Sequence, residues 1–395
     1  MFPSKRGSSK LSSIQFASLV AVVVVLMTFI GLALMRRQNP SPSQPTATPS
    51  ATVPKTQESL PPVAVLPNLP QTASLPDILP QIGQENSELV YNVKIAPNFK
   101  KSDALQSIVD DAVALAAVKG LPTNPLSITL INTKTGEYAA YQQEKPRFPA
   151  SVVKMFWMVY LYAQIEKGIW HEENFIFYLN SMIKKSDNNA ASDILDAITQ
   201  TKSGQNLEGK EYEYWLKNRK KVNKFFQKAG YEKINISQKP FPITSQKIYE
   251  PQGSDLKMRG DPKNPIRNKI TTQQAARLLY EIYDGQSISQ IYSEKMASWL
   301  SIDPATRIEK KDDQNPNEFN PVRGYFSESL PTNVNFGGKA GWTSNTRQEA
   351  AYIATPDGKA AYILVVFAED RTYAYDWKIF PQMSRFVYDR MTNRK

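Results

Sequence analysis

The chain has 395 residues, a formal net charge of +11, no cysteine and a single histidine. Without cysteine it can form no disulfide, thiolate nucleophile or cysteine-bound metal site. A Ser-His-Asp triad would require His171, which lies in a polar stretch that predicts an exposed turn, and a catalytic zinc usually takes two or three histidines. We expect no metal or organic cofactor. A hydrolase built from this chain would need a lysine or a carboxylate as its base.

The first part of the chain predicts a membrane anchor followed by a tether. Residues 14–35 form an uncharged apolar run, and about 20 helical residues are enough to cross a bilayer. Arg36 and Arg37 stand where a cleaved signal peptide would have small residues. We therefore expect a short cytoplasmic tail (1–13), a single-pass anchor in the inner or plasma membrane (14–35) and a Pro/Ser/Thr-rich disordered linker (36–86).

Residues 87–395 predict one α+β domain, which the anchor would place in the periplasm or outside the cell. Ser102 is the expected N-cap of an amphipathic helix over 102–119. Two strands joined by a turn at 133–136 predict a hairpin. The basic residues of the domain are dispersed and accompany no nucleic-acid motif, so we expect no nucleic-acid partner. The expected strands are 127–132, 137–141, 350–354 and 360–367, and the later helices are 151–167, 188–198, 222–229, 272–284 and 376–390.

The segment Ser151-Val-Val-Lys154 begins an apolar helix and is the first motif that carries chemistry. Helical residues three apart lie side by side, so the serine hydroxyl would sit beside the lysine amine. Serine needs an adjacent base, and lysine acts as one if burial and nearby positive charge keep it neutral. Taken alone, this pattern is more often a capped helix with an exposed lysine.

Two further motifs follow in the chain, Ser186-Asp-Asn188 before a helix and Lys339-Ala-Gly341 before a hairpin. Separately they are typical of a polar N-cap cluster and a glycine-rich turn. Together with Ser151 and Lys154 they follow the order S-x-x-K, S-D-N, K-T-G of class A β-lactamases and penicillin-binding proteins. Segments 147–151, 268–279 and 339–343 are also similar to that family. The chain resembles the class A β-lactamases over nearly all of residues 100–395.

The resemblance implies a five-stranded antiparallel sheet flanked by helices, plus an all-helical subdomain. It also implies that Ser151 opens a β-lactam and forms an acyl-enzyme, with Lys154 as base and Ser186 relaying the proton to the leaving nitrogen. The family pattern places the substrate-binding residues at Asn188, Lys339, Gly341, Trp342 and Thr343. The backbone N–H groups of Ser151 and Trp342 would form the oxyanion hole.

Departures from the family pattern concern the third motif, the motif spacing and deacylation. Ala340 stands where the family has Thr or Ser, and Thr343 or Ser344 could supply the missing hydroxyl. The spacing of the motifs indicates a shortened helical subdomain and an insertion over 201–251. The family's deacylating E-x-x-L-N pattern corresponds best to residues 250–254, where Gly253 and Ser254 replace Leu and Asn. Glu250 is the candidate deacylating base, and the alternative is a surface carboxylate.

Three functions stay open from the sequence. The first is β-lactam hydrolysis by a membrane-anchored monomer, and the second is a D,D-peptidase that acts on peptidoglycan stem peptides without Glu250. The third is a non-catalytic cell-wall-binding sensor, which Ala340 favours and the intact Ser151 and Lys154 oppose.

Overall fold

The structure is a computed structural model that describes residues 89–393, except for 314 and 316–318. The expected tail, anchor and linker (1–13, 14–35 and 36–86) lie outside the described residues. Within the described part of the chain, no helix is both long enough and apolar enough to cross a membrane.

The centre of the fold is a six-stranded sheet in the order β1-β3-β2-β6-β5-β4. The expected α+β class is confirmed, but the expected five antiparallel strands are wrong, because β1 pairs in parallel with β3. This strand consists of two exposed lysines, too few for the alternation of four to eight residues that reveals a strand in a sequence. The strands are β1 Lys100–Lys101, β2 Leu126–Asn132, β3 Glu137–Tyr141, β4 Asn335–Thr343, β5 Thr346–Ala354 and β6 Ala361–Ala368.

Both faces of the sheet are covered, as strand β6 shows. All eight of its residues are buried. Ile363, Val365 and Phe367 pack into one hydrophobic core, and the alternating Leu364 and Val366 pack into a second core on the opposite face. A continuous apolar run is therefore what this strand requires.

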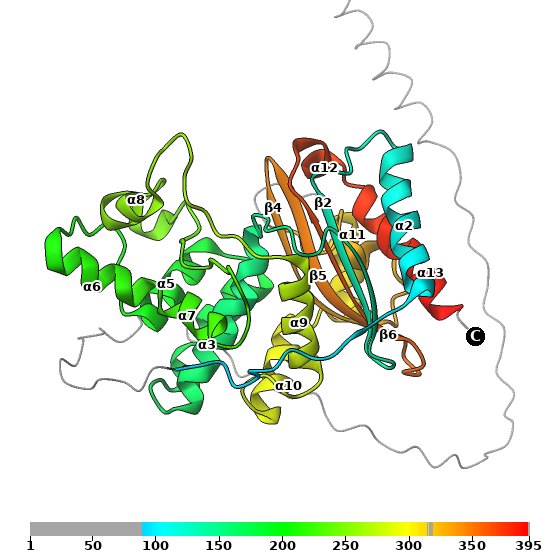
Figure 1. The fold of residues 1–395 in the computed structure, drawn as a ribbon, viewed down its shortest axis with the longest axis horizontal. Helices are drawn as coiled ribbons and strands as arrows, with labels where there is room; N and C mark the ends of the chain where they lie inside the picture. The colour runs from blue at the N-terminus through cyan, green and yellow to red at the C-terminus, as the bar shows by residue number, and fades with distance from the viewer. Residues whose placement is uncertain (1–88, 314, 316–318, 394–395) are drawn as a thin grey trace, which may run out of the picture. The chain divides into compact units, whose positions relative to one another are not determined.

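Helices α2 (Asp103–Val118) and α13 (Ile379–Thr392) lie together over one face of the sheet, with the short helix η5 (Phe326–Ser329) (Figure 1). The predicted N-cap of α2 is confirmed, because the Ser102 hydroxyl accepts a hydrogen bond from Leu105 N. Helices α9 (Thr272–Tyr283) and α10 (Gln290–Leu300) lie on the other face. A capping box between Thr271 and Gln274 fixes the beginning of α9.

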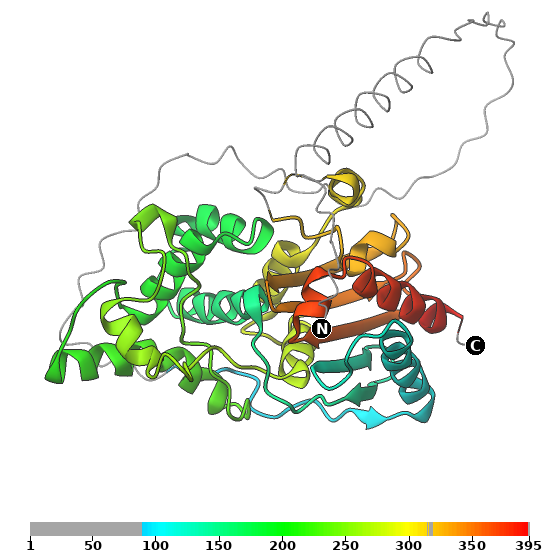
Figure 2. The same cartoon turned by 90° about the horizontal axis from the view of Figure 1, so that it is seen from above.

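A lobe of helices extends from this second face, away from α2 and α13 (Figures 1 and 2). Its buried centre is α3, in which twelve of thirteen residues are buried. The lobe and its connections comprise η1 Ala150–Val153, α3 Lys154–Glu166, η2 Glu172–Asn174, α4 Ile176–Leu179, η3 Asn180–Lys184, α5 Asn188–Thr199, α6 Gly209–Arg219, α7 Lys221–Gln227, η4 Thr244–Gln246 and α8 Gly253–Arg259. Two further helices, α11 Pro304–Asp312 and α12 Arg371–Tyr375, lie in connections on the sheet side.

Candidate active site

Ser151 lies in a tight helical turn at the base of α3. The predicted helix from residue 151 begins as the 3-10 turn η1, and Lys154 N donates to the carbonyls of Ser151 and Val152. Ala150, directly before the serine, has φ +46, in the left-handed region that non-glycine residues seldom adopt. Such a conformation persists only where the surrounding structure holds it. The turn therefore fixes the position of the Ser151 backbone.

Lys154 follows one turn later and its side chain is completely buried. Its Nζ lies 2.6 Å from the Ser186 carbonyl oxygen, 3.0 Å from Asn188 Oδ1 and 3.4 Å from Ser186 Oγ. Among the described residues, no hydrogen bond joins Lys154 to the Ser151 hydroxyl. Catalytic hydrogen bonds are often long or poorly aligned before substrate binds and tighten only in the complex.

Ser186 occupies the junction between two helices. The π-helical turn η3 ends at Lys184, and α5 begins at Asn188 with Asp187 as its N-cap, accepting from Ala190 N at 2.7 Å. Ser186 itself has φ +55. Single π turns are frequent at functional sites. Here the junction directs both the carbonyl and the hydroxyl of one residue toward Lys154.

Strand β4 supplies the third part of the site. Lys339 is 2% exposed, and its Nζ donates to Ser186 Oγ at 2.9 Å and to the Ala340 carbonyl at 3.0 Å. Gly341, two residues on, shares its face of the strand. A Cβ on this glycine would lie 2.8 Å from Ser151 N and 3.0 Å from the Ala150 side chain. Only glycine lets the strand approach the serine turn this closely.

The geometry of β4 directs the N–H of Trp342 outward from the sheet. Strand β4 is at the edge, and Thr343 pairs with Thr346 across a two-residue hairpin, which makes theirs a hydrogen-bonded pair. Alternation then leaves the N–H and C=O of Trp342 unpaired within the sheet. Phe336, of the same parity, shows this directly, because its carbonyl accepts from Ile302 N outside the sheet. Two N–H groups, of Ser151 and Trp342, are thus available beside Gly341.

Burial lowers the pKa of both lysines, and the charge of one acts on the other. Burial lowers the pKa of Lys154 well below its usual value, and the charge of Lys339 lowers it further, opposed by Asp187. Burial also lowers the pKa of Lys339 to about 7, opposed by the carboxyl of Glu349 on β5. Burial raises the pKa of Glu349 itself well above its usual value. Of the two lysines, Lys154 is the one whose surroundings suit a neutral base.

Thr343, the candidate for the hydroxyl that the third motif lacks, lies at the turn between β4 and β5. The Thr343 hydroxyl shares a hydrogen bond of 3.1 Å with Thr346 across the hairpin. Ala340, which stands at the position in question, is 4% exposed and packs into the core beneath α13. Thr343 therefore lies at the end of the site with its side chain held by the turn.

Glu250 is not brought together with the other residues. It is exposed, and no hydrogen bond or ion pair joins it to another described residue. Its neighbours Ile248 and Gln252 reach within 3.4 Å of a Cβ position at Gly204, after the C-terminal end of α5. Asn188 begins that helix, whose twelve residues extend about 18 Å. Thr244 and Ser245, which precede Glu250 in the same loop, do approach the beginning of α5, because both form hydrogen bonds with Asn189.

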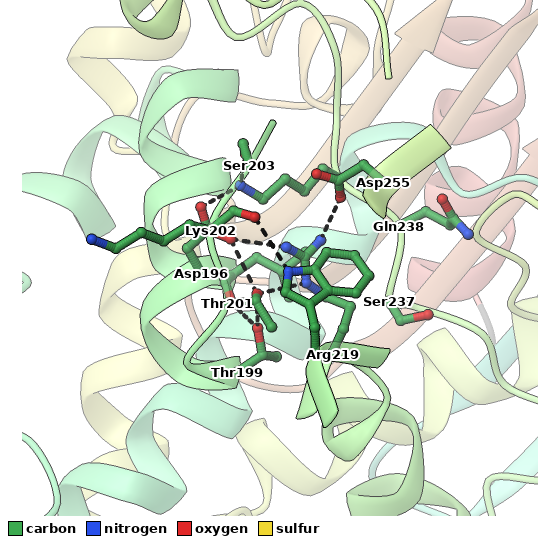
Figure 3. Close-up of polar contacts among 12 residues, drawn as sticks. Asp196, Thr199, Thr201, Lys202, Ser203, Arg219, Ser237, Gln238 and Asp255 are labelled. Carbon is green, nitrogen blue, oxygen red and sulfur yellow. Dashed lines mark hydrogen bonds and ion pairs between the residues drawn. The ribbon is translucent and has the colours of Figure 1, made fainter. Parts of the chain in front are cut away.

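A buried cluster of charged residues holds this loop to the helical lobe, and the sequence did not reveal it (Figure 3). Arg219 is 0% exposed and pairs with Asp196 and Asp255, each at 2.9 Å. Lys239 joins the same Asp196. Asp196 lies in α5, Arg219 in α6 and Asp255 in α8, and Lys239 lies between α7 and η4. Because the four residues belong to separate elements, no regular spacing in the sequence predicts that they meet. Asp187 partly offsets the lowering of the Lys154 pKa and is also the N-cap of α5. Its place directly before that helix is a signal from which the sequence could have identified it.

The sequence also matches a known family. A sequence model described as "Beta-lactamase enzyme family" matches residues 178–391, more than half of the chain. The chain belongs to this family. The matched region of this β-lactamase family member contains Ser186, Asn188 and Lys339, but begins after Ser151 and Lys154. No curated protein matches its sequence significantly.

Several solved structures are similar to this family member. A β-lactamase from Sphaerobacter thermophilus is 18% identical with a TM-score of 0.48, covering 72% of this chain and 95% of the other. An ancestral class A β-lactamase is 18% identical with a TM-score of 0.48, covering 71% and 99%. The protein PBP-A is 15% identical with a TM-score of 0.49, covering 76% and 100%.

Proposed function

We propose that the protein is a serine acyl-transfer enzyme that opens β-lactam rings by forming a covalent acyl-enzyme on Ser151. The observation that carries this proposal is the convergence of two buried lysines on the hydroxyl of Ser186, beside the turn that holds Ser151. A buried cation is costly, and two buried lysines this close disfavour the state in which both are charged. A structural role would not require this arrangement, whereas a base next to a carboxylate-binding cation does.

The residues divide the reaction as follows. The Ser151 hydroxyl attacks the lactam carbonyl carbon while neutral Lys154 takes its proton. The N–H groups of Ser151 and Trp342 hold the oxyanion, a contribution that typically amounts to about 10²–10³ in rate per donor. The C–N bond then breaks and Ser186 passes a proton to the leaving nitrogen, and Lys154 returns to Ser186 the proton that it took from Ser151. Lys339, when protonated, binds the substrate carboxylate.

A second candidate is a D,D-peptidase that acts on peptidoglycan stem peptides and is inhibited by β-lactams through a long-lived adduct. It uses the same acylation step, and the exposed position of Glu250 favours it. With no described carboxylate bonded to Lys154 to activate water, the acyl-enzyme would decay slowly. The predicted anchor over residues 14–35 would hold either enzyme at the surface where cell-wall peptides and β-lactams are found.

Covalent labelling with a fluorescent penicillin tests the shared step. The protein should acquire label, Ser151→Ala should acquire none, and Ser301→Ala, at an exposed serine after α10, should label as the unmodified protein does. Label that persists in Ser151→Ala would refute the assignment of the nucleophile. Absence of label from the unmodified protein would favour the non-catalytic, cell-wall-binding function.

A further inference from the structure

Exposed aromatic side chains gather where the strand that carries the candidate oxyanion hole meets α12. Trp342 is 40% exposed and Tyr375, in α12, is 50% exposed. Of the six tryptophans, Trp342 and Trp377 alone are exposed, and Trp377 lies two residues after Tyr375. Aromatic rings of this size are usually covered, so exposed ones in a group indicate a binding surface.

The two rings form a corner that is held in place. Their centroids lie 6.1 Å apart and their planes meet at 86°, an edge-to-face arrangement. The indole Nε1 of Trp342 donates to the Ala374 carbonyl at 2.8 Å. Arg347 Nη2 donates to the same carbonyl at 2.8 Å, and the completely buried guanidinium also contacts Tyr373 O and Gly324 O. Strand β5 therefore braces α12 against β4.

The corner lies across strand β4 from the serine turn, because alternation puts Trp342, like Arg347 opposite it, on the other face of the strand from Gly341. Trp342 follows Gly341, whose backbone lies against Ser151 N, and consecutive Cα atoms are about 3.8 Å apart. Arg371 lies over the Tyr375 ring, 5.2 Å from its centroid. A substrate whose carbonyl reaches the two N–H groups lies along the open edge of β4, and any part of it that extends toward α12 would meet these rings.

We propose that Trp342 and Tyr375 form a subsite that stacks on a ring-shaped group of the substrate with an apolar face. The proposal rests on the acyl-transfer function proposed above, because it assumes that the substrate carbonyl lies at Ser151. Two sources share this chemistry, the aromatic side chain of a β-lactam and a sugar ring attached to a cell-wall peptide. A flat group lying against one ring would meet the other ring edge-on, which favours rings over flexible chains.

The test compares a substrate that carries a ring with one that does not. Acylation rates are measured for benzylpenicillin and for 6-aminopenicillanic acid, which lacks the aryl side chain. Loss of one aromatic partner should lower the ratio of these rates by about 3- to 10-fold in Tyr375→Ala. Tyr214→Ala, at a 56% exposed tyrosine of α6, is the matched control and should keep the ratio. An unchanged ratio in Tyr375→Ala would overturn the proposal.

A binding measurement separates this proposal from the proposed function. If neither compound acylates the protein, the acyl-transfer function fails, and the affinity ratio is measured instead in the Ser151→Ala background. A ratio that falls when Tyr375→Ala is added supports the subsite, and an unchanged ratio overturns it. The affinities of a disaccharide-bearing muramyl pentapeptide and of the free pentapeptide are compared in the same way, to identify which kind of ring the subsite binds. A preference for the disaccharide that Tyr375→Ala removes assigns a sugar ring, and no ring preference in either pair overturns the subsite.

Discussion

Lys154 and Lys339 donate to the same hydroxyl, that of Ser186, at 3.4 and 2.9 Å from their Nζ atoms. The two lysines come from α3 and β4, on opposite sides of the serine turn. Because each is buried and close to the other, the surroundings disfavour the state in which both are charged. One lysine, Lys154, therefore suits the role of neutral base, and Lys339 suits that of the cation that binds the substrate carboxylate.

Replacing Lys339 should move the pH dependence of acylation. Lys339→Met removes the charge that lowers the pKa of Lys154, so the pKa of Lys154 rises and less of it is neutral at pH 7. The acid limb of the pH–rate profile should move to higher pH, and the rate at neutral pH should fall about tenfold for each pH unit that the limb moves. A penicillin methyl ester, which lacks the carboxylate, isolates this effect from substrate binding. An acid limb that stays in place with the ester would contradict the role of Lys339.

The unmodified protein should itself show a second, alkaline limb. The pKa of Lys339 is lowered to about 7 by burial, so Lys339 loses its proton as the pH rises through that value. Acylation by an anionic penicillin should then decline above about pH 7, because the cation that binds the carboxylate is lost. The methyl ester should not show this decline. The same alkaline limb with both substrates would mean that Lys339 does not bind the carboxylate.

Much of the fold could be predicted because its signals are local. The N-cap Ser102 and the turn at 133–136 identified α2 and the first hairpin, and α5 and α9 begin at the predicted residues. Helix α6 was missed because only Trp215, Asn218 and Arg219 of it are buried, which leaves no apolar stripe. Strand β1 was missed because its pairing, and not its composition, makes it a strand.

The part of the candidate site that consists of the three motifs could be predicted from the sequence. The sequence placed Ser151, Lys154, Ser186, Asn188 and Lys339 together by resemblance, and the distances now bring the last four into one hydrogen-bonded group. The location of Glu250 could not be predicted, because it depends on how the loop packs against the turn after α5. The left-handed backbone at Ala150 and Ser186 was equally hidden, since neither residue type favours it.

Removing the Ser186 hydroxyl should reduce acylation by about 100-fold, because the proton relay between the lysines and the leaving nitrogen is lost. Two variants separate chemistry from strain. Ser186→Ala keeps a side chain at φ +55, whereas Ser186→Gly relieves that conformation. Both should lose rate equally while differing in the free energy of unfolding. Rates that follow stability, rather than the hydroxyl, would show that Ser186 acts only through the fold.

Glu250→Gln should leave the lifetime of the acyl-enzyme unchanged within about twofold, because Glu250 is exposed and contacts no described group of the site. The lifetime is read from the return of unlabelled protein after excess penicillin is removed. Glu166→Gln, at the exposed end of α3, serves as control. A lifetime at least tenfold longer in Glu250→Gln alone would restore this residue as the deacylating base and require the loop to move.

Arg219→Ala should destabilise the protein by about 3–5 kcal/mol, because Asp255 would lose its buried ion-pair partner and Asp196 would keep only Lys239. Urea unfolding measures this difference. Lys217→Ala, exposed on the same helix, should change the free energy of unfolding by less than about 0.5 kcal/mol. Equal, small effects of both variants would show that the cluster in Figure 3 does not hold the loop to the lobe.

Intact-protein mass spectrometry after addition of one equivalent of benzylpenicillin tests the central claim most directly. We expect a mass increase equal to one penicillin, located at Ser151 by peptide mapping, that persists over a time course because no described carboxylate is bonded to Lys154. An adduct that decays rapidly with release of hydrolysed drug would keep the nucleophile and establish efficient β-lactam hydrolysis. No adduct, or an adduct at any other residue, would contradict the assignment of Ser151.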